Sequence, residues 1–458
     1  MRIPALRETN AFQTAARYGT IADMEPSAIT LTIFAAALSL FIADVLPMGL
    51  VVFSVPIALY FGGVIEAKEI FAPLVGQSII LVVAMSVVGA ALFKTGMAER
   101  IGSALFRFCP GERSLMFAVT VFAGGVSAFV SNTGTVAILI PIVMGVAAAR
   151  KVKPCRLLMP LTAGATLGGN ISVIGSPGNL IAKETIEGFS NGAMSITFFE
   201  FAKMGIPLLA AAAAFYALLG PRLLPSRDSD ETSKYEGRAG VKTSWRGWFT
   251  LATLAVSVGV MIAADHWKSL PPMHITACVA AMAVVLFGVI TQKEAFAAFD
   301  MQAVFLLSFM TPLGKAMTTT GAAQTIADAV VSVAGGHGPL LLMAILWLTV
   351  WGLTQIMSNT ATCAMFCPIG WTIAKTLGAD PRAVVIAILI ASSVAVCTPL
   401  ALPANAMILE PANLRFKDFF LPGLVFSAAA FAISMTLLPL LYPFFPQPIS
   451  SGTAAPPA

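Results

Sequence analysis

The chain alternates long uncharged apolar segments with short polar loops. Several apolar segments approach the ~20 residues that an α-helix needs to cross a bilayer. A membrane β-barrel would instead show short stretches of alternating polarity. The pattern therefore predicts an all-α polytopic membrane protein. The apolar segments span residues 27–46, 49–65, 74–93, 114–149, 157–182, 197–220, 248–264, 273–291, 301–318, 338–374, 383–407 and 419–445.

One long polar stretch, residues 222–247, interrupts this pattern near the middle of the chain and carries many charges of both signs. Because it is rich in Lys and Arg, we expect it on the cytoplasmic side. We predict a first half at 27–221 and a second half at 248–445. Tails at 1–26 and 446–458 flank the two halves.

The two halves resemble each other in sequence. The tripeptide Ser-Asn-Thr occurs at 131–133 and again at 358–360, and each copy lies inside a long uncharged stretch. A Pro-x-Asn triplet follows each copy, at 177–179 and at 403–405. Further landmarks keep the same order in both halves, so we predict an internal repeat.

The uncharged stretch from 114 to 149 is too long for one membrane helix, which would measure about 54 Å against a hydrocarbon core of about 30 Å. The first Ser-Asn-Thr interrupts it, and Arg113 and Arg150 flank its ends. Basic ends favour the cytoplasm. We therefore predict a re-entrant hairpin over about 114–150 with the motif at its tip. The alternative is two tilted spans with the motif at a surface.

Residues 338–375 repeat this pattern without the basic flanks, which fits a hairpin that enters from the opposite face. An odd number of crossings in the first half would invert the second half. The predicted fold class is therefore two inverted-topology repeats, each of about five transmembrane helices plus one re-entrant hairpin.

Hydroxyl and amide side chains cluster at each motif, and such groups are costly in hydrocarbon unless they bind something. A hydroxyl residue precedes each motif, Ser127 in one copy and Thr354 in the other. On a continuous helix, Ser127 would share a face with Ser131, and Thr354 with Ser358. Helix capping would explain a single motif, whereas a repeated one indicates one site built from two halves.

Helix breaks are predicted at 175–178 and 401–404, because Pro and Gly disrupt the backbone hydrogen-bond ladder. Unwound carbonyls with hydroxyl and amide oxygens suit Na⁺, and half-helix N-termini suit an anion. No Asp or Glu lies between 114 and 182, which favours Na⁺ over proton coupling. The pattern is typical of a secondary transporter.

Composition excludes several other classes. The chain is 58% hydrophobic and 11% charged, with a mean hydropathy of +0.87. No cluster of basic and aromatic residues suggests nucleic acid, despite a net charge of +5. The three histidines lie at predicted segment ends and form no catalytic cluster, so we do not expect an enzyme. A channel remains an alternative, which saturable flux would separate from a carrier.

The paired motifs and loops resemble those of the divalent anion/sodium symporter family (sodium:dicarboxylate/sulfate symporters) of the ion-transporter superfamily. The resemblance covers nearly all of residues 27–445. It assigns two sets of Na⁺ ligands: Ser127, Ser131, Asn132 and Gly175 in the first, and Thr354, Ser358, Asn359 and Ala401 in the second. It places these residues at the substrate: Asn132, Thr133, Ser176, Pro177, Asn359, Thr360 and Pro403.

The resemblance implies Na⁺-coupled symport of a dicarboxylate, a tricarboxylate or sulfate, by an elevator motion in a homodimer. It implies a multi-pass protein of the cell (inner) membrane, with a small anion and the lipid bilayer as partners. The alternatives are a sodium-independent anion exchanger of the same fold, a metalloid oxyanion efflux protein or a cation/proton antiporter. Leu402 replaces the hydroxyl residue usual in the second loop, so we expect lopsided substrate binding.

Overall fold

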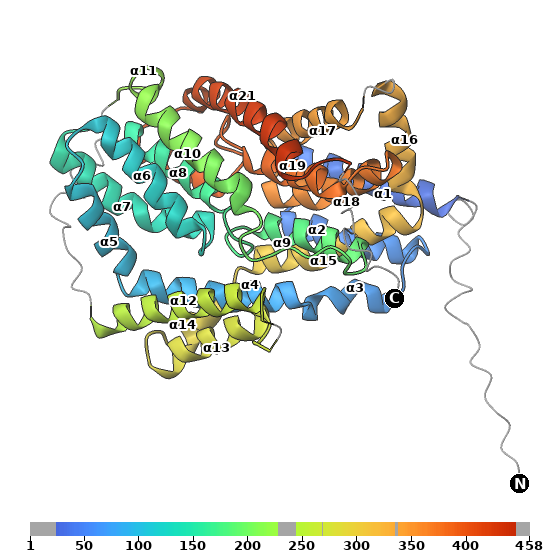
Figure 1. Ribbon diagram of the computed structural model, residues 1–458, viewed down its shortest axis with the longest axis horizontal. Coiled ribbons are helices and arrows are strands. Elements are labelled where there is room, and N and C mark those ends of the chain that lie inside the picture. Colours follow the sequence, from blue (N-terminus) through green and yellow to red (C-terminus); the bar gives the residue numbers. More distant parts are fainter. Residues whose placement is uncertain (1–23, 228–243, 268, 335–337, 446–458) are drawn as a thin grey trace, which may run out of the picture.

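The computed structural model describes residues 24–227, 244–267, 269–334 and 338–445 (Figure 1). These residues form helices and loops and contain no β-strand. The predicted all-α class is therefore confirmed. Most of the predicted polar linker (222–247), nearly all of the N-terminal tail and all of the C-terminal tail lie outside the described residues.

Prolines, glycines and polar turns divide each half into helices of unequal length. The first half contains α1 (Pro26–Ala43), α2 (Met48–Phe61), α3 (Ala67–Phe71), η1 (Ala72–Val75), α4 (Gln77–Lys94), α5 (Met97–Arg107), α6 (Glu112–Ser127), α7 (Asn132–Arg150), α8 (Cys155–Gly168), α9 (Pro177–Phe189), α10 (Ala202–Leu218) and α11 (Gly220–Leu223). The second half contains α12 (Trp245–Ala264), α13 (Met273–Leu286), α14 (Gln292–Ala297), α15 (Met301–Thr319), α16 (Ala322–Ala334), α17 (Pro339–Thr354), α18 (Asn359–Thr376), α19 (Pro381–Ser393), α20 (Pro403–Met407) and α21 (Phe416–Leu441).

Several of these helices have the length and composition of membrane spans. In the described ranges, five helical segments are long and apolar enough to cross a bilayer: α1, the stretch from α3 to α4, α7, α12 and α21. Shorter apolar helices, such as α2 and α13, lie beside them. Large apolar side chains such as Phe61 and Leu286 are exposed on the outside, as expected of a surface that faces lipid.

The helices follow the same order in both halves. The series α4 to α10 corresponds to the series α15 to α21. Gly96 joins α4 to α5 at φ 66° and Gly321 joins α15 to α16 at φ 78°, a backbone conformation that favours glycine. Contacts repeat as well, since α6 packs on α8 and α17 packs on α19. These correspondences support the internal repeat; the inverted orientation in the membrane stays a prediction.

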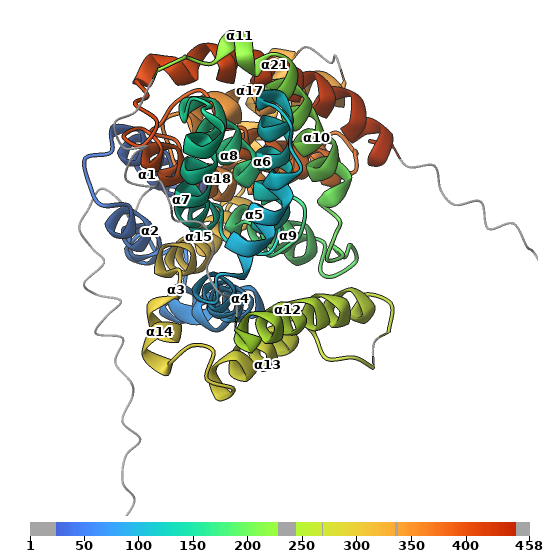
Figure 2. The same cartoon turned by 90° about the vertical axis from the view of Figure 1, so that its left-hand side faces the viewer.

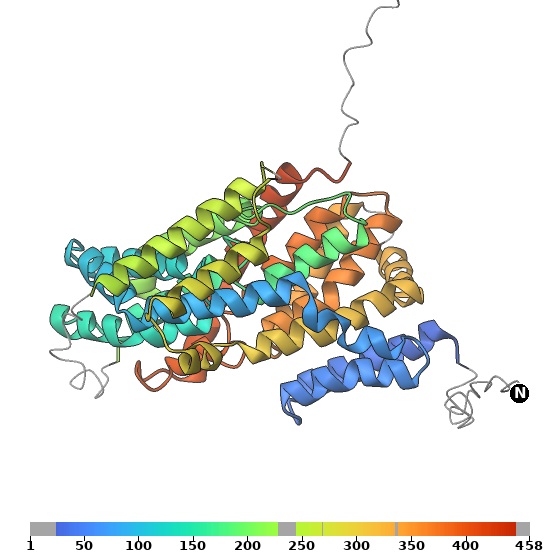
Figure 3. The same ribbon diagram turned by 90° about the horizontal axis from the view of Figure 1, so that it is seen from below.

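Helices of each half pack against helices of the other half, so the two halves do not form separate units. α4 packs against α13 and α12, which lie on its outer side (Figures 2 and 3). α15 correspondingly packs against α2. Near the motifs, α9 of the first half packs on α18, and α20 of the second half packs on α7. Both hairpins and both broken helices therefore form one block, whose parts come from the two halves.

Candidate functional site

Each predicted hairpin is a pair of helices joined by a short tip. α6 ends at Ser127 and α17 ends at Thr354. The next helices, α7 and α18, begin one residue after Ser131 and Ser358, which are their N-caps. The prediction that Ser127 and Ser131, or Thr354 and Ser358, share one helix face is therefore wrong. The chain reverses direction between the two hydroxyls. Residues four positions apart share a face only within one continuous helix.

The same hydroxyl–amide pair closes both tips. Ser127 Oγ donates a hydrogen bond to Asn132 Oδ1 at 2.8 Å. Thr354 Oγ1 donates to Asn359 Oδ1 at 2.9 Å. Both hydroxyl residues are fully buried, and both asparagines are partly buried. The structure therefore brings together the hydroxyl and the amide that the sequence placed in each candidate site.

Both predicted helix breaks are present. The chain leaves α8 at Gly168 and enters α9 at Pro177; it leaves α19 at Ser393 and enters α20 at Pro403. The residues between these points, 169–176 and 394–402, are the first and second unwound loops. Their backbone groups have left the helical ladder, so they need other partners when buried.

One buried asparagine brackets each unwound loop. Asn179 Nδ2 donates to the carbonyl oxygens of Gly169 and Ser172, at 2.7 and 2.6 Å. Asn405 makes the corresponding bonds to Ala395 at 2.9 Å and to Thr398 at 3.1 Å. Sequence reasoning used these asparagines only as landmarks of the repeat. Their recurrence two residues after each proline was the signal of this structural role.

Each unwound loop also binds the tip of its own hairpin. Ser172 Oγ donates to the carbonyl oxygen of Ala128. Thr398 Oγ1 donates to the carbonyl oxygen of Gln355 at 2.6 Å. We call residues 127–135 with 169–179 the first half-site. Residues 354–362 with 394–405 are the second half-site.

Backbone carbonyls converge tightly in the first half-site. A Cβ on Gly175 would lie 2.5 Å from the carbonyl oxygen of Gly169 and 2.9 Å from those of Ser127 and Ala128. Only glycine fits at this point. The Ser127 hydroxyl and the Asn132 amide oxygen belong to the same tip. Such a group of carbonyl, hydroxyl and amide oxygens can coordinate a hard cation such as Na⁺.

Hydrogen bonds link the two half-sites to each other. Ser393 Oγ, at the end of α19, donates to Asn170 Oδ1 in the first unwound loop at 3.1 Å. Cys363 Sγ of α18 lies 3.5 Å from the carbonyl oxygen of Gly178 in α9. Of the predicted substrate residues, Pro403 is exposed and the others are partly buried: Asn132, Thr133, Ser176, Pro177, Asn359 and Thr360.

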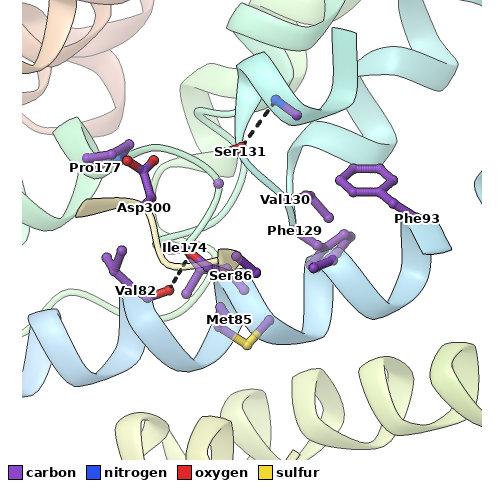
Figure 4. Close-up of a pocket in the computed structure, with 14 residues that line it drawn as sticks. Val82, Met85, Ser86, Phe93, Phe129, Val130, Ser131, Ile174, Pro177 and Asp300 are labelled. Atoms are coloured by element: carbon purple, nitrogen blue, oxygen red, sulfur yellow. Dashed lines mark hydrogen bonds between the residues drawn. The ribbon is translucent and has the colours of Figure 1, made fainter. Parts of the chain in front are cut away.

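A cavity of about 200 Å³ opens beside the first tip (Figure 4). Ser131, Gly175 and Pro177 line one side, and α4 lines the other with residues such as Phe93. Asp300 also lines it, and its carboxylate accepts a hydrogen bond from the backbone N–H of Ala303 at 3.0 Å. The two predicted hairpins, 114–150 and 338–375, contain no Asp or Glu, but the cavity beside the first tip is lined by one carboxylate.

A wider cavity of about 590 Å³ lies along the other part of α9. Lys183, Glu184 and Glu187 of α9 line it, together with Asp265 and His274. Lys183 forms an ion pair with Glu187. Ser78 of α4 and Thr311 of α15 line the same cavity as Glu184. One helix, α9, thus borders both cavities, and the charges of the wider cavity were absent from the sequence-based site.

Known proteins share this sequence pattern and fold. The sequence profile of the citrate transporter family, CitMHS, matches residues 38–275 and 260–454. The Escherichia coli "Uncharacterized transporter YfbS" is 20% identical over 90% of this chain and 99% of its own length. The "Sodium-dependent high-affinity dicarboxylate transporter 3" of Caenorhabditis elegans is 22% identical over 87% of this chain and 80% of its own length.

Among solved structures, the fold is similar to that of Neisseria gonorrhoeae MtrF, which is described as belonging to a class of antimetabolite efflux pumps. The TM-score is 0.61, at 14% sequence identity, over 94% of this chain and 97% of MtrF. At this identity the likeness concerns the fold. Together with the apolar helices, these matches confirm a multi-pass integral membrane protein.

Proposed function

The chain belongs to the citrate transporter family and is a membrane transporter, and on this premise we propose that it is a sodium-coupled symporter of a small anion. The observation that carries the proposal is the first half-site. There, carbonyl oxygens from two segments converge on Gly175 beside a buried hydroxyl and an amide oxygen. A cation of low charge and hard character fits such a set of neutral oxygens.

The cation ligands of this half-site are side chains and carbonyls of Ser127, Ser131, Asn132 and Gly175. The tip and the unwound loop contribute together, so a bound Na⁺ would fix one against the other. The corresponding set in the second half, Thr354, Ser358, Asn359 and Ala401, is the predicted second cation site. Its contacts differ from those of the first set, and they are compared below.

The anion would lie between the half-sites. α7, α18 and α9 all begin there, and the free N–H groups at a helix N-terminus attract negative charge. The first half supplies Asn132, Thr133, Ser176 and Pro177. The second supplies Asn359, Thr360 and Pro403, with the apolar Leu402 where Ser176 has a hydroxyl. A dicarboxylate, a tricarboxylate or sulfate presents several oxygens to such donors, and a relative named as a sodium-dependent dicarboxylate transporter supports this class.

For the transport step, we propose that the block of hairpins and broken helices moves as an elevator against the remaining helices of a homodimer. Hydrogen bonds such as Ser393 to Asn170 hold the block together across the two halves. The two cavities lie where this block meets α4 and α15. A boundary with open space at the start of α9 and along its later turns suits sliding better than a fully packed one does.

Uptake of labelled citrate, succinate or sulfate into proteoliposomes tests this function. We expect accumulation that follows an imposed inward Na⁺ gradient and disappears with a sodium ionophore. A protonophore serves as the control for proton coupling, which Asp300 and Glu184 make worth measuring. Uptake that ignores Na⁺ and requires an anion inside the vesicles would instead establish the sodium-independent exchanger.

A further inference from the structure

The two unwound loops differ at their first turn. In the first loop a backbone hydrogen bond closes the turn, since Ile171 N donates to the carbonyl oxygen of Gly168 at 3.0 Å. In the second loop the side-chain amide of Gln355 stands between the corresponding groups. Cys397 N donates to Gln355 Oε1 at 3.1 Å, and Gln355 Nε2 donates to the carbonyl oxygen of Val394 at 3.0 Å.

Gln355 has no polar counterpart in the first half, where Ala128 follows Ser127 as Gln355 follows Thr354. Its side chain is buried, with 8% of the residue exposed. Its amide also donates to the carbonyl oxygen of Trp351 at 3.0 Å. Every polar group of this side chain thus has a protein partner, as a buried amide requires.

Two more differences close the second half-site. Thr354 Oγ1 lies 2.7 Å from the carbonyl oxygen of Ser392 in α19, whereas the second acceptor of Ser127 Oγ is the carbonyl oxygen of Val130 in its own tip, at 3.5 Å. Ala401 carries a buried methyl group where Gly175 has none, and it is 2% exposed. In the first half, a methyl group at this point would collide with three carbonyl oxygens. The carbonyls of the second half-site therefore cannot converge in the same way.

Unsatisfied polar atoms show the opposite distribution. Within the two half-sites, the buried side-chain atoms without a hydrogen-bond partner all belong to the first: Thr135 Oγ1, Asn170 Nδ2 and Asn179 Oδ1. The counterpart of Thr135 is Thr362, whose hydroxyl donates to the carbonyl oxygen of Ser358 at 3.0 Å. Buried polar atoms usually have partners. Two of these atoms, Thr135 Oγ1 and Asn179 Oδ1, are oxygens that can face a cation, whereas Asn170 Nδ2 is a hydrogen-bond donor and cannot. The first half-site thus keeps buried oxygens available for a ligand, while no buried side-chain polar atom of the second half-site lacks a protein partner.

We propose that the Gln355 amide takes the place of a second cation, so that each protomer binds one Na⁺, at the first half-site. The amide N–H donates to a carbonyl that would otherwise face a cation, and it ties the second tip to its loop as a cation would. Gln355 is thus a positioning residue. The inference rests on the proposed Na⁺ coupling and revises the predicted second cation site.

Binding of ²²Na⁺ to the purified full-length protein tests the stoichiometry, with choline chloride keeping the ionic strength constant. We expect one Na⁺ per protomer. Ser127→Ala should weaken binding at least tenfold, and the matched Thr354→Val should keep the affinity within about twofold. Two Na⁺ per protomer, with one lost in Thr354→Val, would overturn the inference alone. No Na⁺ binding at all would overturn the proposed coupling itself.

Substitutions of Gln355 test its role separately. Gln355→Glu keeps the acceptor for Cys397 N but replaces the donor with a carboxylate, so we expect a second Na⁺ per protomer. Gln355→Leu has a similar size and no polar group, so we expect a lower melting temperature and still one Na⁺. A Glu variant that folds and binds a single Na⁺ would show that Gln355 does not stand in a cation's position.

Discussion

The two half-sites share the same backbone arrangement and several hydrogen bonds, and they differ in individual side chains. In both, a buried hydroxyl binds the asparagine of the motif, and a second asparagine brackets the unwound loop. Two of the differences bear most directly on the cation: Gly175 and Ala128 stand in one half where Ala401 and Gln355 stand in the other. A duplicated backbone can thus keep its geometry while single side chains decide whether it offers carbonyls to an ion.

The helices behind the tips show the same contrast. Gly124 of α6 lies directly against Gly164 and Gly168 of α8, so the two backbones approach closely. At the positions that correspond to Thr120 and Gly124, α17 carries Trp347 and Trp351, whose rings stack with centroids 6.3 Å apart. The first half gains close approach from small residues, and the second half fills its space with large ones.

The largest effect is expected from a substitution at Gly175, which distinguishes the first half-site from the second. Gly175→Ala should abolish the stabilisation of the protein by Na⁺, because the new methyl group meets carbonyl oxygens at 2.5–2.9 Å. Overpacking of this kind costs about 1–3 kcal/mol. Melting temperature measured against NaCl concentration reports Na⁺ binding by linkage. Ala401→Gly is the matched control and should keep the Na⁺ response; a Na⁺ response retained in Gly175→Ala would remove this position from the cation site.

The asparagine hydrogen bonds that both half-sites share predict that matched substitutions destabilise the two halves equally. Asn179→Ala and Asn405→Ala each leave two carbonyl oxygens without their donor, and such a loss costs about 1–3 kcal/mol. Unfolding in the absence of Na⁺ isolates this loss from ion binding. We expect the two variants to be destabilised by similar amounts. A clear loss in one half and none in the other would contradict the common role.

A smaller effect concerns the carboxylate beside the first half-site. Asp300 caps α15, and the corresponding cap of α4 is Gly76, so this negative charge exists on one side only. Asp300→Asn keeps a good capping residue and removes the charge. We expect the Na⁺ concentration for half-maximal stabilisation to rise by a few-fold, because the cavity loses a cation-attracting group. An unchanged Na⁺ dependence would leave Asp300 as a helix cap only.

The smallest effect is expected for two ion pairs that join the halves. Lys94 pairs with Glu294 at 2.6 Å, and Lys315 pairs with Glu69 at 2.5 Å. The four side chains are partly exposed, by 26–58%, and ion pairs in contact with solvent contribute little. Lys94→Gln or Lys315→Gln should therefore shift the melting temperature only slightly. A large shift in either variant would show that these pairs hold the halves together.

The Lys94–Glu294 pair also has a defined dependence on pH. Lys94, together with the backbone N–H and hydroxyl of Thr291, holds the pKa of Glu294 at about 2, below its ordinary value of 4.5. Its contribution is therefore complete above pH 4.5 and is lost as the pH falls toward 2. Between pH 5 and 8, melting curves of the wild type and Lys94→Gln should differ by a constant amount.

The sequence alone determined the elements that depend on local pattern. Apolar stretches, the Pro and Gly breaks near Pro177 and Pro403, and the repeated motifs were enough to place the long apolar helices, the two tips and the two unwound loops. They missed α5 and α16, which lie between the predicted apolar segments. It failed at the shared helix face of Ser127 and Ser131, because a hydroxyl spacing does not reveal that the chain turns between them.

Only the tertiary structure decided what surrounds these elements. Asp300 lines the cavity beside the first tip although it is distant in sequence, and Gln355 reaches groups of the second loop that no sequence pattern connects to it. The convergence of carbonyls on Gly175 depends on two segments packed at van der Waals distance. Sequence periodicity reports the direction of side chains along one segment, whereas an ion site depends on oxygens that packing brings together from several segments.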